Sequence, residues 1–176
     1  METVLQLEEF MTKPSAALVE DIKKIDGDIL ILGIAGKMGP TLAKMAKRAA
    51  EEAGIEKRII GVARFSNKDM KEQLESAGIE TITCDLLDEE QLAQLPNIPN
   101  IIFMAGNKFG TVNNEHFTWA MNTYVPGRVA DKFKNSNIVV FSSGNIYPFT
   151  PVTSGNCGED VTPIPVGEYA MSTLGR

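Results

Sequence analysis

The chain has 176 residues, of which 43% are hydrophobic and 23% are charged, and its formal net charge is −6. This length and composition are typical of one soluble globular domain with a sizeable core. The acidic balance argues against nucleic acid or an anionic membrane as a partner, since both require a basic patch, and no apolar run approaches the ~20 residues of a membrane helix.

Helices and strands are predicted to alternate along the chain. Residues 1–13 are expected to form a polar lead-in and residues 14–25 a short helix. The predicted strands are 28–34, 58–63, 80–84, 100–105 and 137–142, and the other predicted helices are 41–53, 68–77, 88–95, 115–134 and 168–176. A Gly- and Pro-rich loop separates the last strand from the last helix, and loops of that length are usually functional.

This alternation predicts an α/β fold, a Rossmann-type doubly wound parallel sheet with helices on both faces. The expected sheet has about five strands in the order 3-2-1-4-5, with a ligand crevice at the carboxyl ends of the first and fourth strands, where the order reverses. Residues 1–27 are expected to precede the domain, and residues 28–176 to form it.

Gly33, Gly36 and Gly39 form the most informative motif, because they join an apolar strand to an Ala-rich helix. In such a triplet one glycine permits the turn, another lets backbone approach a pyrophosphate, and a third lets the helix pack on the strand. The helix N-terminus then favours the anion. Taken alone, the triplet is equally compatible with a plain tight turn. Lys37 and Met38 lie inside the loop and are predicted to contact the same ligand, and Met38 excludes an ATP-binding P-loop, which needs Ser or Thr there.

The end of the second predicted strand suggests which dinucleotide is bound. An acid there would bond the ribose 2′-hydroxyl of NAD, whereas an arginine would accommodate the 2′-phosphate of NADP. The chain has Arg64 and no acid at this point, and Lys37 is predicted to lie near the same phosphate. The sequence therefore favours NADP over NAD, and the alternative is that both cations are simply solvated.

The ends of the third and fourth strands supply further cofactor candidates. Asp85 could accept a hydrogen bond from the adenine amino group while Leu86 packs on the ring, although Asp85 could equally be a turn or cap residue. The small-residue run that ends the fourth strand would let a cofactor ribose approach; its members are Met104, Ala105 and Gly106.

Ser143, at the end of the fifth strand, and Tyr169, at the start of the last helix, form a possible acid/base pair. A serine that bonds a substrate oxygen and a tyrosine that moves its proton suit carbonyl–alcohol chemistry.

In their order along the chain, these motifs resemble those of the extended short-chain dehydrogenase/reductase superfamily, and within it those of the NAD(P)-dependent sugar epimerase/dehydratase group. The resemblance covers residues 28–172 and adds Asn122, Tyr147 and Pro165 to the residues above. It implies that the three glycines hold pyrophosphate, that Asp85 and Leu86 hold adenine, and that Ser143 and Tyr169 are catalytic. Asn122 is implied to support its helix and a water near the site.

Two departures from the family pattern limit this transfer. Thr173 stands where the family has a lysine that binds the nicotinamide ribose and activates the tyrosine. Because an isolated tyrosine titrates near pH ~10, Tyr169 without a nearby cation would be a poor base. Arg176 could supply that charge, but we expect it to be solvated at the surface. The family also continues beyond this chain, so we expect a fragment that lacks the substrate lobe, with little turnover of its own.

Other residues carry weaker signals. Gly144 and Asn145 replace the acidic pair of the dehydratase branch, which argues against sugar 4,6-dehydration. His116 is expected on a helix surface and Trp119 in the core. The two cysteines, Cys84 and Cys157, have neither metal nor disulfide spacing, so we expect no metal site and a cytoplasmic location. A homodimer through helices 115–134 and 168–176 is a further expectation.

The sequence thus supports two functional hypotheses. The first is the NAD(P)-binding domain of an epimerase/dehydratase-type oxidoreductase that acts on a hydroxyl-bearing small molecule, such as a nucleotide sugar. The alternative is a non-catalytic dinucleotide-binding sensor or regulator on the same fold.

Overall fold

The computed structural model describes residues 2–155 and 157–176, and the chain divides into two compact units. The first, here the sheet unit, comprises Met1–Ala105 and Lys132–Val140. The second, here the helix–loop unit, comprises Gly106–Asp131 and Phe141–Arg176. Each predicted site residue belongs to one of these units.

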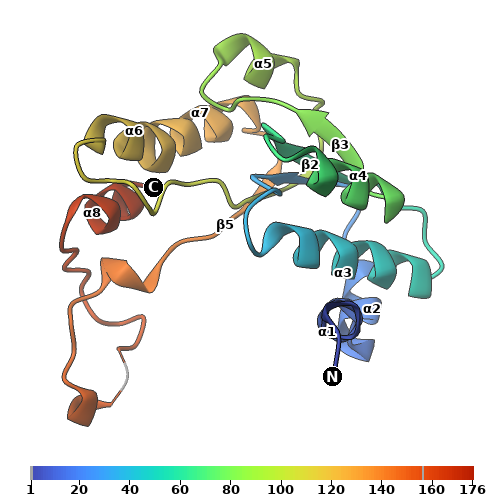
Figure 1. Cartoon of the computed structure of the whole chain (residues 1–176), viewed down its shortest axis with the longest axis horizontal. Helices are drawn as coiled ribbons and strands as arrows, with labels where there is room; N and C mark the ends of the chain where they lie inside the picture. Colours follow the sequence, from blue (N-terminus) through green and yellow to red (C-terminus); the bar gives the residue numbers. More distant parts are fainter. Residues whose placement is uncertain (1, 156) are drawn as a thin grey trace. The chain divides into compact units, whose positions relative to one another are not determined.

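The sheet unit contains a five-stranded parallel sheet in the order β3-β2-β1-β4-β5, which confirms the predicted fold class and topology (Figure 1). The strands are β1 (Ile29–Leu32), β2 (Ile59–Ala63), β3 (Glu80–Thr83), β4 (Asn100–Phe103) and β5 (Asn137–Val140). In the central register, Ile29 lies opposite Ile59 of β2 and Asn100 of β4. The sheet order reverses at β1 and β4, so the carboxyl ends of these two strands form the expected crevice edge.

Five α-helices accompany the strands in this unit: α1 (Val4–Thr12), α2 (Ala16–Ile22), α3 (Gly39–Glu52), α4 (Lys68–Ser76) and α5 (Glu89–Gln94). The helices α3, α4 and α5 are the connections between successive parallel strands. Side chains that precede them cap two of these helices: Asn67 accepts from the Asp69 N–H, and Asp88 from the N–H groups of Glu90 and Gln91. No helix of the described residues has both the length and the apolarity to cross a membrane.

Helix α1 is the main departure from the predicted elements, because residues 4–12 are helical where a polar lead-in was expected. Thr3 and Gln6 form a capping box that satisfies the first backbone N–H groups. Glu8 pairs with Lys44 of α3, and Glu9 with Arg48. The helix is thus attached through its polar side, which hydrophobic periodicity does not detect.

The core explains why the central strand β1 appears in the sequence as a continuous apolar run. Every residue of β1 is buried, and Ile29 and Ile31 join one cluster with Ile34 and residues of α3 and α4. Leu30 and Leu32 alternate with them and are equally inaccessible, so β1 is buried on both faces, as parallel strands usually are.

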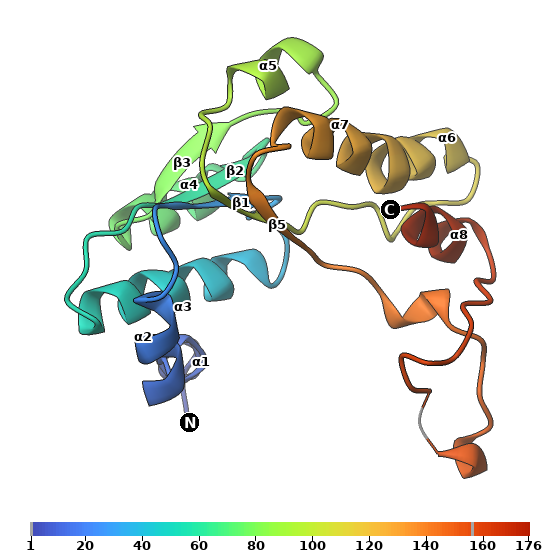
Figure 2. The same cartoon turned by 180° about the vertical axis from the view of Figure 1, so that it is seen from behind.

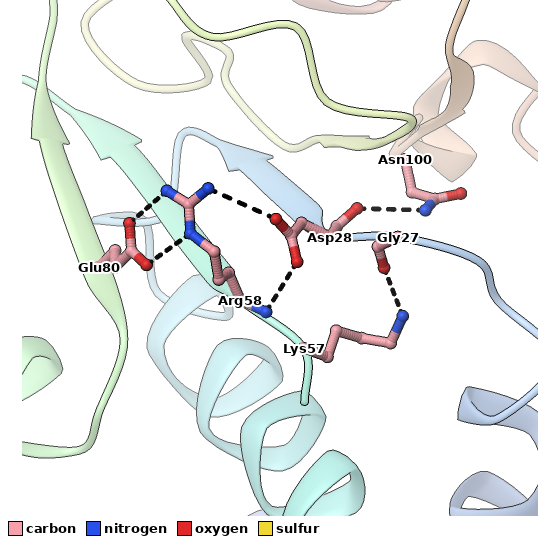
Figure 3. A network of polar contacts seen from close by, with 6 residues as sticks. All are labelled: Gly27, Asp28, Lys57, Arg58, Glu80 and Asn100. Atoms are coloured by element: carbon pink, nitrogen blue, oxygen red, sulfur yellow. Dashed lines mark hydrogen bonds and ion pairs between the residues drawn. The ribbon is translucent and has the colours of Figure 1, made fainter. Parts of the chain in front are cut away.

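A polar network ties the amino ends of the strands together, at the edge opposite the glycine loop (Figure 3). Arg58 forms two parallel 2.7 Å bonds with the Glu80 carboxylate, and its backbone N–H donates to Asp28. The hydrogen bond from Arg58 holds the pKa of Glu80 below its ordinary value. Lys57 is 8% exposed and donates to the carbonyls of Ile25 and Gly27.

The helix–loop unit is built on a helical rod, with α8 (Glu168–Gly175) beside it (Figure 2). The rod was predicted as one helix over 115–134, but it consists of α6 (Glu115–Trp119), a π-helical turn (Ala120–Tyr124) and α7 (Val125–Lys132). Pro126 explains the interruption, because it lacks the N–H that would bond to the Asn122 carbonyl. The Val125 N–H reaches back to Ala120. Two 3₁₀ turns, Gly144–Ile146 and Val152–Ser154, lie in the loop before α8.

Candidate functional site

The three loop glycines differ in how close an added Cβ would lie to the neighbouring atoms. Gly33 has a φ of +90°, and a Cβ there would lie 2.6 Å from the backbone nitrogen of Ala105. A Cβ at Gly39 would collide with the carbonyl oxygen of Ile34. At Gly36, by contrast, the nearest atom is the Gly33 carbonyl oxygen at 3.4 Å, an ordinary contact. The fold therefore requires glycine at 33 and 39 for packing, whereas the space at Gly36 is open.

The loop also leads into an uncapped helix. Met38 is the N-cap of α3, and no side chain accepts from the first-turn N–H groups. Pro40 stands at the start of the helix, where its missing N–H costs nothing. Lys37 and Met38 are both exposed beside this terminus. The arrangement offers an anion the positive end of a 14-residue helix and an adjacent ammonium group.

The turn after β2 places Arg64 in solvent. Phe65, the next residue, has a φ of +47°, a conformation that a bulky side chain rarely adopts. Its ring is 8% exposed and belongs to the core cluster under α3 and α4. Packing of Phe65 thus sustains the strained turn that keeps Arg64 at the surface.

The ends of β3 and β4 supply the remaining candidates in the sheet unit. Asp85 accepts the Leu87 N–H at 3.0 Å, so it has the turn role that was considered for it, and its adenine role stays a prediction. Leu86 is 7% exposed. Cys84 is buried, and burial raises the pKa of its thiol to about 11. Ala105 touches the Gly33 position, so the ends of β1 and β4 meet as the topology requires.

In the helix–loop unit, Asn122 is the centre of a buried hydrogen-bond cluster. It is 0% exposed. Its Oδ1 accepts the Asn107 N–H at 2.8 Å, and its Nδ2 donates to the Asn107 carbonyl at 2.9 Å and to Ser172 Oγ at 3.0 Å. The side chain therefore joins the π-helical turn, the segment after Gly106 and helix α8.

The two predicted catalytic side chains are both partly buried in this unit. Ser143 Oγ accepts the Asn145 N–H at 3.2 Å, which orients the hydroxyl at the start of a 3₁₀ turn. Tyr169 lies in the first turn of α8, and the Lys108 ammonium group is 5.8 Å from the centre of its ring. Sequence reasoning missed Lys108; its only signal was a cation directly after the small-residue end of strand four.

Arg176 corrects the sequence-based expectation of a solvated surface residue. Its guanidinium is partly buried and donates to the Phe141 carbonyl at 2.8 Å, the Asn122 carbonyl at 3.3 Å and Asn122 Oδ1 at 3.1 Å. Thr173, at the position of the family's lysine, is 3% exposed, and among the described residues its hydroxyl has no hydrogen-bond partner.

Of the two predictions made for residues of helix α6, that for Trp119 is wrong and that for His116 is confirmed. Trp119 is 38% exposed and donates its indole N–H to Glu168, so it is not a core residue. The amphipathic indole satisfies its polar group at the surface instead. His116 is exposed, as predicted.

Two hollows accompany these residues. A cavity of about 370 Å³ follows Ser143 in the helix–loop unit, lined by Asn145, Tyr147, Phe149, Cys157 and Val166 among others. A wider groove of about 1280 Å³ lies along α1 and α3 in the sheet unit, and it contains none of the predicted site residues. The residues that line the smaller hollow likewise include neither Ser143 nor Tyr169.

Comparison with solved structures finds chains of the same fold. Over 85% of this chain and 50% of the other, it is similar to the ADP-L-glycero-D-manno-heptose-6-epimerase of Helicobacter pylori, with 20% identity and a TM-score of 0.66. The UDP-glucuronic acid 4-epimerase of Bacillus cereus, solved with NAD, gives 21% identity, coverage of 84% and 49%, and a TM-score of 0.65. WbmG of Bordetella bronchiseptica, also solved with NAD, has 19% identity and a TM-score of 0.65, over 84% of this chain and 47% of the other.

These structures share only the fold at such identities, and the chain spans about half the length of each. No curated protein sequence matches it. The model of the NAD dependent epimerase/dehydratase family matches residues 29–174, which is most of the chain and begins at β1. The chain therefore belongs to the NAD dependent epimerase/dehydratase family.

Proposed function

We propose that the chain is the dinucleotide-binding part of an epimerase/dehydratase-type oxidoreductase whose substrate is a hydroxyl-bearing small molecule, such as a nucleotide sugar. The observation that carries this proposal is the open position at Gly36, between two glycines that packing requires. A Cβ would fill the place where backbone must approach a pyrophosphate. A UDP-glucuronic acid 4-epimerase solved with NAD and an ADP-L-glycero-D-manno-heptose-6-epimerase are among the structural neighbours, and they support the same class.

The residues present fit a dinucleotide. Gly33 and Gly39 would shape the loop, and the positive end of α3 would favour the pyrophosphate. Asp85 and Leu86 would hold adenine, while Met104, Ala105 and Gly106 would border the ribose. A bound nicotinamide would supply the chemistry of accepting a hydride from the substrate and returning it.

Ser143 and Tyr169 would handle the substrate oxygen and its proton. The Ser143 hydroxyl, already oriented by the Asn145 N–H, donates to Asn145 Oδ1 at 3.4 Å, a long contact that a substrate oxygen could replace. Tyr169 would pass the proton to or from that oxygen. Asn122 would keep α8 and the segment after β4 in register.

The test of the dinucleotide site is a calorimetric titration with NAD⁺ and NADP⁺. We expect Gly36→Ala to fold normally and to bind at least about tenfold more weakly, because its methyl group occupies the place of a phosphate oxygen. Gly36→Asp should abolish binding, since it also adds a negative charge.

Gly127→Ala is the matched control for that titration, because Gly127 also has open space around it but lies in α7. Its affinity should equal that of the wild type. Unchanged affinity in a folded Gly36→Asp variant, or no binding by the wild type, would contradict the proposed function.

We also propose that the chain prefers NADP to NAD. Arg64 is exposed at the end of β2 with no acid beside it. A charge-assisted bond to the 2′-phosphate is worth about 1.5–3 kcal/mol, or roughly a ten- to hundredfold difference in affinity. Arg64→Ala should remove the preference, whereas Lys68→Ala, another exposed cation nearby in sequence, should retain it. Equal wild-type affinities for the two dinucleotides would refute the preference.

The alternative function is a non-catalytic sensor or regulator, and it is favoured by Thr173, a buried threonine at the position of the family's lysine. Tyr169-dependent turnover of NADP(H) with nucleotide sugars, lost in Tyr169→Phe, would decide for the enzyme. The homodimer through 115–134 and 168–176 stays a prediction, and part of those surfaces is already used where Thr123 bonds the Ser172 carbonyl.

A further inference from the structure

The helix–loop unit contains a second cluster of contacts that the family resemblance does not assign, centred on Arg176. We propose that Arg176 is the positioning residue of the candidate catalytic pair: its guanidinium fixes helix α8, and with it Tyr169, against the segment that leads to Ser143. This inference rests on the proposed function, because it takes Ser143 and Tyr169 as the reacting pair.

The hydrogen bonds of Arg176 join the relevant segments. Its Nη1 donates to the carbonyl of Phe141, two residues before Ser143. Its Nε and Nη2 donate to the carbonyl and the side-chain oxygen of Asn122. The guanidinium thus binds the approach to Ser143 and the π-helical turn at the same time, from the helix that carries Tyr169. Three donors in a planar fork suit this task better than a single ammonium group.

The acceptors are available for a local reason. Pro126 follows Asn122 by four residues and has no N–H, so the Asn122 carbonyl lacks its ordinary helical donor. The Arg176 Nε–H lies 3.3 Å from that oxygen. The proline that interrupts the helix therefore exposes a carbonyl that the guanidinium can use.

Gly106 gives an independent indication that the position of the guanidinium is built into the fold. A Cβ at residue 106 would lie 2.6 Å from Arg176 Nη2 and 3.1 Å from Asn122 Oδ1. Only a residue without a side chain leaves room for the guanidinium there. The small residue predicted to border a ribose thus also makes space for Arg176.

Arg176 also brings a positive charge to the end of helix α8. Burial lowers the pKa of the guanidinium, and the electrostatic interaction with Tyr169 acts in the opposite direction. A guanidinium nevertheless stays protonated at physiological pH. Since Thr173 is buried and uncharged, Arg176 is the cation that the same helix provides.

Fluorine NMR of protein labelled with 3-fluorotyrosine tests the proposal, because the chain has only three tyrosines, and Tyr→Phe variants assign them. We expect Arg176→Met to shift and broaden the Tyr169 resonance while Tyr147 stays in place. Arg176→Lys, which keeps the charge but not the fork, should cause a smaller change in the same direction. Amide exchange along α8 should be faster in Arg176→Met.

Arg128→Met is the matched control, since Arg128 contacts the hydroxyl of Tyr124 at 2.9 Å in the same unit. It should move the Tyr124 resonance and leave Tyr169 unchanged. An unmoved Tyr169 resonance in folded Arg176→Met would overturn the proposal. If that variant does not fold, an unmoved resonance in Arg176→Lys would do so. The NAD⁺ titration of the Gly36 variants is independent of these spectra, so failure of the proposed function would be seen separately.

Discussion

Replacing Gly39 by alanine is expected to lower the free energy of unfolding of the sheet unit by about 3 kcal/mol or more. An added Cβ would collide with the carbonyl oxygen of Ile34 and would lie 2.6 Å from its carbonyl carbon and 2.8 Å from its Cα. These are backbone atoms at the end of β1, so no side-chain rotation can relieve the contact. Chemical denaturation followed by amide exchange in β1 and α3 would measure the loss.

Gly36→Ala is the control for this prediction, because it lies in the same loop and its Cβ would meet an atom only at 3.4 Å. We expect its stability to stay within about 1 kcal/mol of the wild type. Equal stability of the two variants would show that α3 can move away from β1, and would contradict the close packing described at Gly39.

The second large effect is expected at Asn122. Asn122→Ala should destabilise the helix–loop unit by about 3 kcal/mol or more, since it leaves the Asn107 N–H and carbonyl without their partners and opens a cavity. Amide exchange is the appropriate measurement, because the chain has two units and global unfolding need not be a single transition. Protection should be lost first around Asn107 and along α8.

Asn145→Ala provides the comparison for Asn122→Ala. Asn145 is exposed in the same unit, and replacing a surface residue of this kind usually changes stability by less than about 0.5 kcal/mol. If Asn122→Ala were no more destabilising than Asn145→Ala, the buried cluster around Asn122 would not hold the unit together.

Local signals were sufficient for the sheet and for the residues at its carboxyl edge. The central strands β1 and β2 are short apolar runs, and such runs can be recognised in the sequence because a central parallel strand is buried on both faces. The glycine spacing marks the loop before α3, and the helices α4 and α5 begin after the side chains of Asn67 and Asp88 that cap them. Parallel pairing and right-handed crossovers then leave few strand orders, among them the observed one.

Helix α1 and the π-helical turn were missed for a common reason. Helix α1 leaves its apolar residues Val4, Leu5 and Phe10 exposed and attaches through ion pairs, so no buried stripe marks it. The turn at 120–124 arises because Pro126 has no N–H for the usual helical hydrogen bond. Hydrophobic periodicity gives no information about the loss of one backbone donor.

By itself, the sequence determined the α/β class, the strand order and the glycine loop, because these depend on periodicity and on contacts between neighbouring elements. Only the tertiary structure decided that Gly36 is open while Gly39 is packed, since that depends on the distance to Ile34. It also decided that Arg176 is partly buried and donates to distant acceptors. Its acceptors, Asn122 and Phe141, lie 54 and 35 residues away along the chain, and no local pattern records which distant carbonyls a guanidinium will meet.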